Sequence, residues 1–201
     1  MKVGVIGCGF AGMESHLPAL STLAGVDVVA VADTDPSRAR AAAQRFGVPR
    51  CFANGEELLS GSDAEVVAVC VRSPFHRSVG CAVLAADRHL LLEKPLALSV
   101  EDGAALLECA SRSGGRAAVG FNLRAHRLAR QAREIVRQGL LGDVKAVRST
   151  LVSGAKFTHA AAWRQIRTSG GGVLFEMAVH HFDLWRFLLG AEIEQMQAFA
   201  Q

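Results

Sequence analysis

The first fifteen residues, MKVGVIGCGFAGMES, constrain the fold more than any other stretch of the chain. A short apolar run, Val3–Ile6, is followed by glycines at positions 7, 9 and 12 and then by a helix-like stretch. This order predicts a buried strand, a tight turn and a helix whose free N–H groups face the turn, the arrangement that binds the diphosphate of a dinucleotide. Gly7 permits the turn, Gly9 leaves bare backbone for the diphosphate, and Gly12 lets the helix pack close to the strand. The spacing alone also fits a glycine turn in any α/β protein.

The next apolar run strengthens the dinucleotide interpretation. Val28–Ala32 ends at Asp33, 21 residues after Gly12. This is close to the spacing of about 20 expected for a carboxylate that accepts hydrogen bonds from the adenosine ribose. A carboxylate there repels a 2′-phosphate, so we predict NAD, while Arg38 is close enough in sequence to keep NADP possible. The alternative is that Asp33 caps the helix that starts near Pro36.

Composition and charge exclude several classes of protein. The chain of 201 residues suits one large domain or one and a half, and its net charge of +3 comes with no basic block, so nucleic acid is not an expected partner. No apolar run approaches the length of about 20 residues that spans a membrane, and a strand beginning at Lys2 leaves no room for a signal peptide. The cysteines are odd in number and lack C-x-x-C spacing, so we expect reduced, mostly buried thiols in a cytoplasmic protein. They are Cys8, Cys51, Cys70, Cys81 and Cys109.

Strands and helices alternate over the first part of the chain, which predicts a doubly wound parallel sheet of the Rossmann type. The expected strands are Val3–Ile6, Val28–Ala32, Cys51–Phe52, Glu65–Val71, His89–Leu92 and Ala117–Phe121. The expected helices between them include Pro36–Phe46, Glu56–Leu59, Phe75–Ala86 and Ser99–Arg112. The pattern then changes to a basic helix, a strand, a loop, a helix and a strand. These are Arg124–Gln138, Val144–Val152, the loop with Trp163 and Arg164, Val173–Leu189 and Ile193–Ala200.

Ligands of open parallel sheets bind at the carboxyl ends of the strands. Five residues follow such ends and are expected to line one crevice: Gly7, Asp33, Arg72, Lys94 and Asn122. Pro95 keeps the backbone of Lys94 out of the helical region, so the lysine stays at its strand end. Beside a nicotinamide, it can form a hydrogen bond with a substrate hydroxyl or carbonyl. The alternative is an ordinary solvated lysine.

The helix after Gly170-Gly171-Gly172 carries a second candidate group. Glu176 and His180 are four residues apart, so we expect them one turn apart on one helix face. A carboxylate placed there can orient the imidazole and raise its pKa, which suits a general base that takes a hydroxyl proton as a hydride leaves. Ordinary surface charges are the alternative. No metal is predicted, because a third ligand of clear spacing is missing.

Taken together, these stretches resemble the Gfo/Idh/MocA oxidoreductase family over essentially the whole chain. The resemblance is carried by VGVIGCGFAG, VVAVADTDPSRA, VVAVCVRSPFH, HLLLEKPLA, VGFNLR and GGGVLFEMAVHHFDLWRFLLG. It implies a pyridine-nucleotide Rossmann domain over residues 1–121 and a partial α/β domain over residues 122–201. The second domain would carry an open, mainly antiparallel sheet that binds substrate and forms a homo-oligomer.

The resemblance also implies roles for individual residues. Lys94 would be the active-site lysine, His180 the catalytic histidine that exchanges a proton with a sugar hydroxyl, and Glu176 its carboxylate partner. The residues expected at the cofactor are Gly7, Gly9, Phe10, Ala11, Gly12, Asp33, Arg38, Arg72, Pro74, Glu93 and Lys94. Those expected at the substrate are Lys94, Asn122, Trp163, Arg164 and His180.

The chain departs from the family pattern at several places. Glu176 stands where the family usually has Asp, and Ala178 where it has Gly. Pro74-Phe75-His76 replaces Pro-Asn-x-x-His, so neither that Asn nor that His is carried over. Family members are generally much longer. Three alternatives follow: the remaining strands of the second sheet are missing from this chain, another chain supplies them, or the chain is a short natural form with impaired catalysis.

The predicted function is NAD(P)-dependent hydride transfer to or from a secondary hydroxyl or carbonyl of a sugar, cyclitol or related polyol. Two alternatives stay open. One is glycoside cleavage by an NAD-dependent member of the same family. The other is a non-catalytic NAD(P)-binding regulator, which the same fold can serve.

Overall fold

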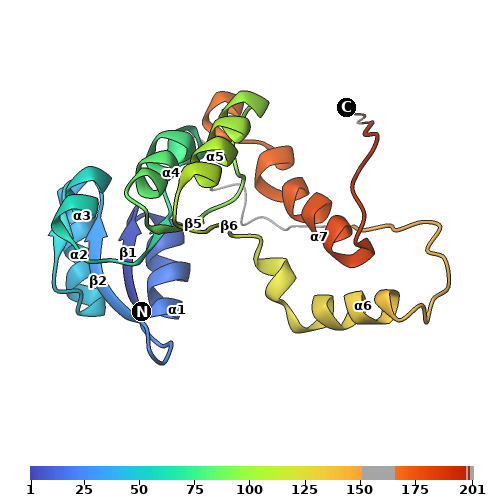
Figure 1. The fold of residues 1–201 in the computed structure, drawn as a ribbon, viewed down its shortest axis with the longest axis horizontal. Helices are drawn as coiled ribbons and strands as arrows, with labels where there is room; N and C mark the ends of the chain where they lie inside the picture. Colours follow the sequence, from blue (N-terminus) through green and yellow to red (C-terminus); the bar gives the residue numbers. More distant parts are fainter. Residues whose placement is uncertain (151–165, 198, 200–201) are drawn as a thin grey trace. The chain divides into compact units, whose positions relative to one another are not determined.

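The computed structural model of the chain describes residues 1–150, 166–197 and 199. The chain divides into two compact units (Figure 1). The first contains Met1–Gly120 and Thr168–Gly170, and the second contains Phe121–Arg167 and Gly171–Gln201.

The first unit is built on a six-stranded sheet of order β3-β2-β1-β4-β5-β6, in which every neighbouring pair is parallel. The strands are β1 (Lys2–Ile6), β2 (Asp27–Ala32), β3 (Cys51–Phe52), β4 (Val66–Val69), β5 (His89–Leu92) and β6 (Ala117–Val119). This confirms the predicted parallel Rossmann sheet.

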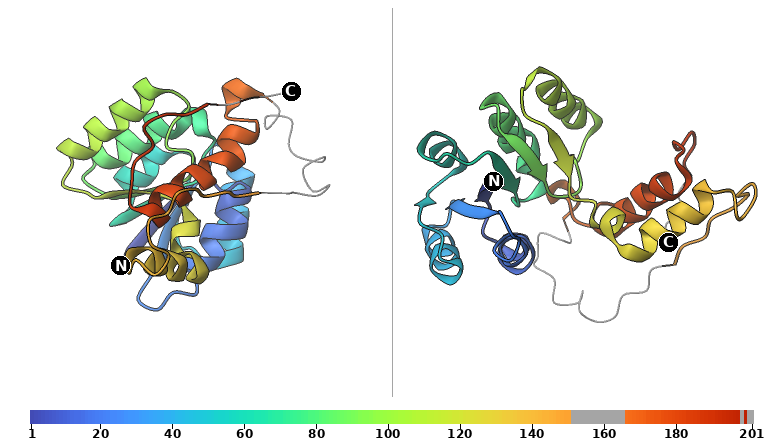
Figure 2. Two further views of the ribbon diagram at one scale, coloured as in Figure 1. Left: turned by 90° about the vertical axis from the view of Figure 1, so that its right-hand side faces the viewer. Right: turned by 60° about the horizontal axis from the view of Figure 1, so that its bottom comes forward.

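Helices cover both faces of this sheet (Figure 2). They are α1 (Leu17–Leu20), α2 (Pro36–Phe46), α3 (Gly55–Gly61), α4 (His76–Ala85) and α5 (Val100–Arg112). Alternate residues of a central strand enter different apolar clusters, since Val67 and Val69 join one cluster and Ala68 joins the other. The continuous apolar runs of the sequence are therefore strands buried on both faces.

Local signals fix the helix boundaries closely. Asp35 caps α2 by accepting a hydrogen bond from the Ser37 N–H at 2.9 Å, and Gly47 ends it with φ of +65°. Ser99 caps α5 by accepting from the Asp102 N–H at 3.1 Å. Capping side chains and a left-handed glycine are readable in the sequence, which is why these boundaries agree with the prediction.

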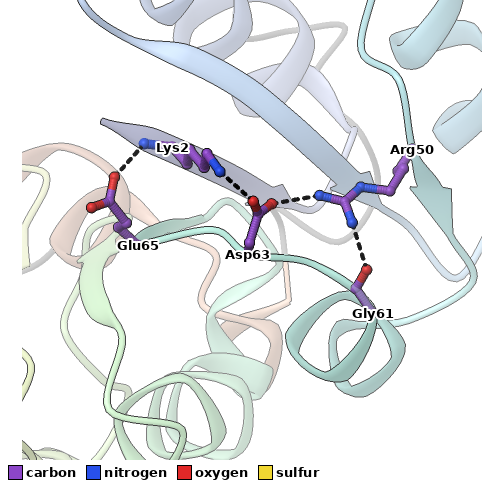
Figure 3. A network of polar contacts seen from close by, with 5 residues as sticks. All are labelled: Lys2, Arg50, Gly61, Asp63 and Glu65. Carbon is purple, nitrogen blue, oxygen red and sulfur yellow. Dashed lines mark hydrogen bonds and ion pairs between the residues drawn. The ribbon is translucent and has the colours of Figure 1, made fainter.

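A polar network joins the amino ends of β1 and β4 to the start of β3 (Figure 3). Asp63 pairs with the Lys2 ammonium and accepts from Arg50 Nη2 at 2.6 Å, while Glu65 accepts from the Lys2 backbone N–H at 2.7 Å. The hydrogen bonds from Lys2 and Arg50 lower the pKa of Asp63 to about 2. Because these side chains are exposed, the network contributes little to stability. It lies at the amino ends of the strands, opposite their carboxyl ends.

The prediction that all five cysteines are reduced thiols was wrong for two of them. Cys81 of α4 and Cys109 of α5 form a disulfide, with their Cα atoms 5.5 Å apart. The sequence gives no spacing signal for this pair, because it is the packing of two crossover helices that brings residues 28 positions apart into disulfide range. Because of this disulfide, the cysteines no longer argue for a reducing compartment. Of the free cysteines, Cys8 and Cys70 are buried and Cys51 is exposed.

The regular secondary structure among the described residues of the second unit is helical. The 3₁₀ turn η3 (Asn122–Ala125) leads into α6 (Arg127–Arg137), and the π-helical turn η7 (Leu174–Ala178) leads into α7 (Val179–Leu189). Helices α6 and α7 pack against each other.

The antiparallel sheet predicted for this part of the chain is not confirmed. The described residues of the two expected strands, Val144–Val152 and Ile193–Ala200, form no strand, and Val144, Val147 and Met196 expose their side chains. A strand needs a neighbour to satisfy its backbone groups and cover its apolar face, and local β-propensity does not replace one. None of the described helices is long and apolar enough to cross a membrane.

Candidate functional site

The register of the sheet aligns the carboxyl ends of its four central strands. Ile6 pairs with Ala32 on one side and with Val69 on the other, and Val69 pairs with Leu92. The residues that follow these ends therefore start from one edge of the sheet. Gly7, Asp33, Arg72 and Lys94 all do so in the first unit, whereas Asn122 belongs to the second.

The glycine turn has the geometry of a diphosphate cradle. Gly7 has φ of +99°, and an added Cβ would lie 2.7 Å from the Cys70 carbonyl group. A Cβ on Gly12 would lie 2.1 Å from the Gly7 oxygen, whereas a Cβ on Gly9 would meet nothing within 4 Å. The turn and the close helix approach thus require Gly7 and Gly12, and Gly9 presents bare backbone to open space. These residues fit a bound dinucleotide.

The two residues between Gly9 and Gly12 differ in exposure. Phe10 is 75% exposed, while Ala11 packs against the cluster around Val5 and Leu17 and precedes the π-helical turn η1 (Gly12–His16). Of these two side chains, the Phe10 ring is therefore the more accessible to a ligand.

Asp33 is oriented by two backbone N–H groups. Its Oδ2 accepts from the Cys8 N–H and its Oδ1 from the Asp35 N–H, both at 2.8 Å. The cap of α2 is Asp35, so the alternative interpretation of Asp33 as that cap was wrong. Arg38 is exposed, and its Nε lies 3.5 Å from an Asp35 oxygen. Burial and the Asp33 charge raise the pKa of the neighbouring Cys8 thiol to about 12.

The turns after β4 and β5 carry the remaining candidates of the first unit. Pro74 is the middle residue of the 3₁₀ turn η2 (Ser73–Phe75), and the Arg72 guanidinium lies over the half-exposed Phe75 ring at 5.8 Å. Glu93 follows β5, and its Oε2 accepts from the Lys94 backbone N–H at 3.2 Å. The Lys94–Pro95 peptide bond is cis.

The candidate residues His180, Glu176 and Asn122 lie in the second unit. His180 is in the first turn of α7, with its ring edge-to-face against Phe121 at 6.3 Å between centroids. Glu176 lies in η7, and Asn122 begins η3. Trp163 and Arg164 fall outside the described residues.

The residues around Glu176 and His180 do not form one regular α-helix. The sequence predicts one regular α-helix over Val173–Leu189, but the first turn is π-helical. The π turn Leu174–Ala178 contains Glu176, and His180 follows it in α7. Such turns occur frequently at functional sites.

Comparison with known families decides the class of protein. Residues 1–121 match the oxidoreductase family described by its NAD-binding Rossmann fold, and residues 129–201 match the GFO/IDH/MocA C-terminal domain. The chain belongs to the Gfo/Idh/MocA oxidoreductase family. The cofactor of this Rossmann fold is NAD, in agreement with the glycine cradle and Asp33.

Curated relatives match this family member over nearly its whole length. An uncharacterized oxidoreductase of Rhizobium meliloti is 34% identical over 200 residues, covering 98% of this chain and 59% of the relative. The myo-inositol 2-dehydrogenase of Thermotoga maritima is 29% identical over 198 residues, covering 98% of this chain and 58% of the relative. The chain therefore spans less than two thirds of the length of these relatives.

A solved structure with ligands is also similar. The scyllo-inositol dehydrogenase of Lactobacillus casei with bound NAD(H) and scyllo-inositol has a TM-score of 0.85 and 25% identity. The match covers 94% of this chain and 56% of that structure.

Sequence reasoning set aside His76, which the structure shows to be a buried link between two strand ends. Its Nδ1 lies 2.7 Å from the Pro95 oxygen and its Nε2 3.1 Å from the Val71 oxygen. Burial lowers the pKa of His76 and outweighs these backbone contacts, which act to raise it. The imidazole thus ties the turn that carries Lys94 to the turn after β4. The sequence signal that could have indicated this role is the place of His76 in the first turn of the helix that follows a buried strand.

His16 was also missed. Its Nε2 lies 2.6 Å from Glu93 Oε1, and both side chains are mostly buried. Burial acts to raise the pKa of Glu93, but the hydrogen bonds and charges of His16 and Lys94 together outweigh it, so this pKa is lowered. His16 is the last residue of the π-helical turn η1. No sequence pattern predicts such a turn.

We expect Asp33→Ala to weaken NAD binding about 10- to 100-fold, because charged hydrogen bonds are worth about 1.5–3 kcal/mol each. Isothermal titration of the protein with NAD measures this. Asp35→Ala is the matched control, since it removes a carboxylate two residues away that caps α2. Equal losses of affinity in the two variants would contradict the role assigned to Asp33.

Proposed function

We propose that the protein is an NAD-dependent dehydrogenase that transfers a hydride from a secondary hydroxyl of a cyclitol, sugar or related polyol. The observation that carries the proposal is the position of Lys94. It follows β5 at the same sheet edge at which the glycine cradle follows β1, and β4 alone lies between these strands. The named inositol dehydrogenases among the relatives support the substrate class.

The first unit would bind the cofactor. The bare backbone at Gly7, Gly9 and Gly12 would hold the diphosphate, and Asp33 would accept from the adenosine ribose hydroxyls. Further contacts are proposed for Phe10, Ala11, Arg38, Arg72, Pro74 and Glu93. Bound NAD supplies the hydride acceptor, C4 of its nicotinamide ring.

Lys94 would act on the reacting oxygen of the substrate. Its ammonium would donate a hydrogen bond to that oxygen, position the carbon that loses the hydride and stabilise negative charge as the proton leaves. The Lys94 backbone is fixed by the Glu93 carboxylate, and the neighbouring Pro95 by His76, so the donor starts from a rigid turn.

A histidine would take the proton. His180 would accept it from the substrate hydroxyl as general base, with Glu176 orienting the imidazole. Asn122, Trp163 and Arg164 are proposed as substrate contacts. The loss of one hydride and one proton converts the secondary alcohol to a ketone.

The test is incubation of the protein with NAD and a panel of polyols, including myo-inositol, scyllo-inositol and simple glycosides, with NADH followed by absorbance. We expect NADH to accumulate with at least one cyclitol or sugar alcohol. Glycoside cleavage without net NADH would favour the glycosidase mechanism instead. Tight NAD binding with no turnover on any member of the panel would favour a regulator.

A further inference from the structure

An ion pair in the second unit joins η3 to α7. Arg124 Nε donates to Asp183 Oδ2 at 2.8 Å and its Nη2 donates to Oδ1 at 2.6 Å, so the contact is bidentate. Asp183 is only 4% exposed. A buried carboxylate needs a paired charge, and the planar guanidinium fork matches it in both distance and direction.

Arg124 is held by a second contact. Its guanidinium lies 5.6 Å from the centre of the Phe187 ring, which Arg133 of α6 also approaches, at 4.5 Å. The hydrogen bond to Asp183 raises the pKa of Arg124 above its ordinary value. An arginine paired with one side chain of α7 and placed over another cannot easily change its orientation.

The same two segments meet again at the candidate catalytic histidine. Phe121 precedes Arg124 by three residues, and His180 precedes Asp183 by three residues. The Phe121 and His180 rings meet edge-to-face at an interplanar angle of 85°. The polar contact and the aromatic contact therefore form two parallel links between the segment 121–124 and the first turns of α7.

We propose that Arg124 and Asp183 are positioning residues for His180. Their ion pair holds η3 on α7 so that the Phe121 ring fixes the orientation of the imidazole. This rests on the proposed function, in which His180 accepts the substrate proton. Neither Arg124 nor Asp183 touches the reacting atoms in this proposal, since they act through Phe121.

The chain offers a matched control on the same helix. Arg186 of α7 forms a bidentate pair with Glu192 at 2.6 and 2.8 Å, but this pair is largely exposed. Glu192→Gln makes the same acid-to-amide change as Asp183→Asn without touching the segment 121–124. It separates loss of a salt bridge in general from loss of the positioning pair.

The first measurement is the NMR spectrum of the histidine ring C–H groups in the full chain, and it needs no turnover. The chain has seven histidines, so the His180 signals are assigned with His180→Gln. We expect Asp183→Asn and Arg124→Lys to shift the His180 signals. Phe121→Leu, which removes the aromatic ring itself, should shift them too, whereas Glu192→Gln should leave them in place. Unshifted His180 signals in folded Asp183→Asn and Arg124→Lys would overturn the proposal. If Asp183→Asn does not fold, Arg124→Lys decides by the same criterion.

The second measurement separates positioning from general stability. With a polyol that the protein oxidises, Asp183→Asn is expected to lower kcat about 10- to 100-fold, the cost of a misplaced catalytic group, with KM for NAD unchanged. An equal kcat in wild type and variant would also overturn the proposal. If no polyol is oxidised, the proposed function fails while the NMR result still decides the positioning role.

Discussion

Replacing Lys94 by alanine is expected to abolish polyol oxidation while leaving NAD affinity nearly unchanged. Loss of a single donor to a developing oxyanion typically costs about 100- to 1,000-fold in kcat. The cofactor contacts proposed for the glycine cradle and Asp33 do not involve the Lys94 ammonium, so NAD affinity should change by less than about twofold, as for independent sites. Steady-state kinetics and a calorimetric NAD titration on the same preparation measure both quantities.

The control is Lys2→Ala, which removes the same charge from the opposite end of the sheet (Figure 3). This variant should keep full activity. Unaltered turnover in Lys94→Ala, or an equal loss in both variants, would reject the role given to Lys94. Arg in place of Lys94 should not restore activity, because a planar guanidinium on a longer side chain does not place its donors where an ammonium does.

Gly12→Ala is expected to remove NAD binding and to destabilise the first unit. The new Cβ would lie 2.1 Å from the Gly7 oxygen, a backbone atom that cannot rotate away. Overpacking of this kind costs about 1–3 kcal/mol, or roughly 2–12 °C in Tm for a chain of this size. Thermal unfolding and NAD titration together measure the two effects.

Gly9→Ala separates binding from folding. A Cβ at Gly9 meets nothing within 4 Å, so the variant should keep the wild-type Tm. The same methyl group would stand where the diphosphate approaches, so NAD affinity should still fall. If Gly9→Ala binds NAD as tightly as the wild type, the diphosphate does not lie on this loop.

The first unit was predictable because its signals are local. The apolar runs, the glycines and the caps of α2 and α5 each specify structure within a few residues, and parallel pairing follows from their alternation with helices. The separation of 21 residues between Gly12 and Asp33 then predicted that both belong to one dinucleotide site. Nothing in these arguments required a contact between remote parts of the chain.

The features that sequence reasoning missed all depend on remote contacts or rare local geometry. Cys81 and Cys109 meet only because two helices pack together, and His16 reaches Glu93 from a π-helical turn. His76 looked displaced along the sequence, yet its ring contacts the carbonyl of Pro95. The described residues of the two strands expected in the second unit form no strand for a related reason, since a strand is defined by its partner.

The most direct test of the account is a crystal structure of the protein with NAD and a polyol that it oxidises. We predict the diphosphate on the backbone at Gly9, with the Lys94 ammonium and the His180 imidazole both within hydrogen-bond distance of the same substrate hydroxyl. A complex in which these two side chains face different cavities would contradict the account.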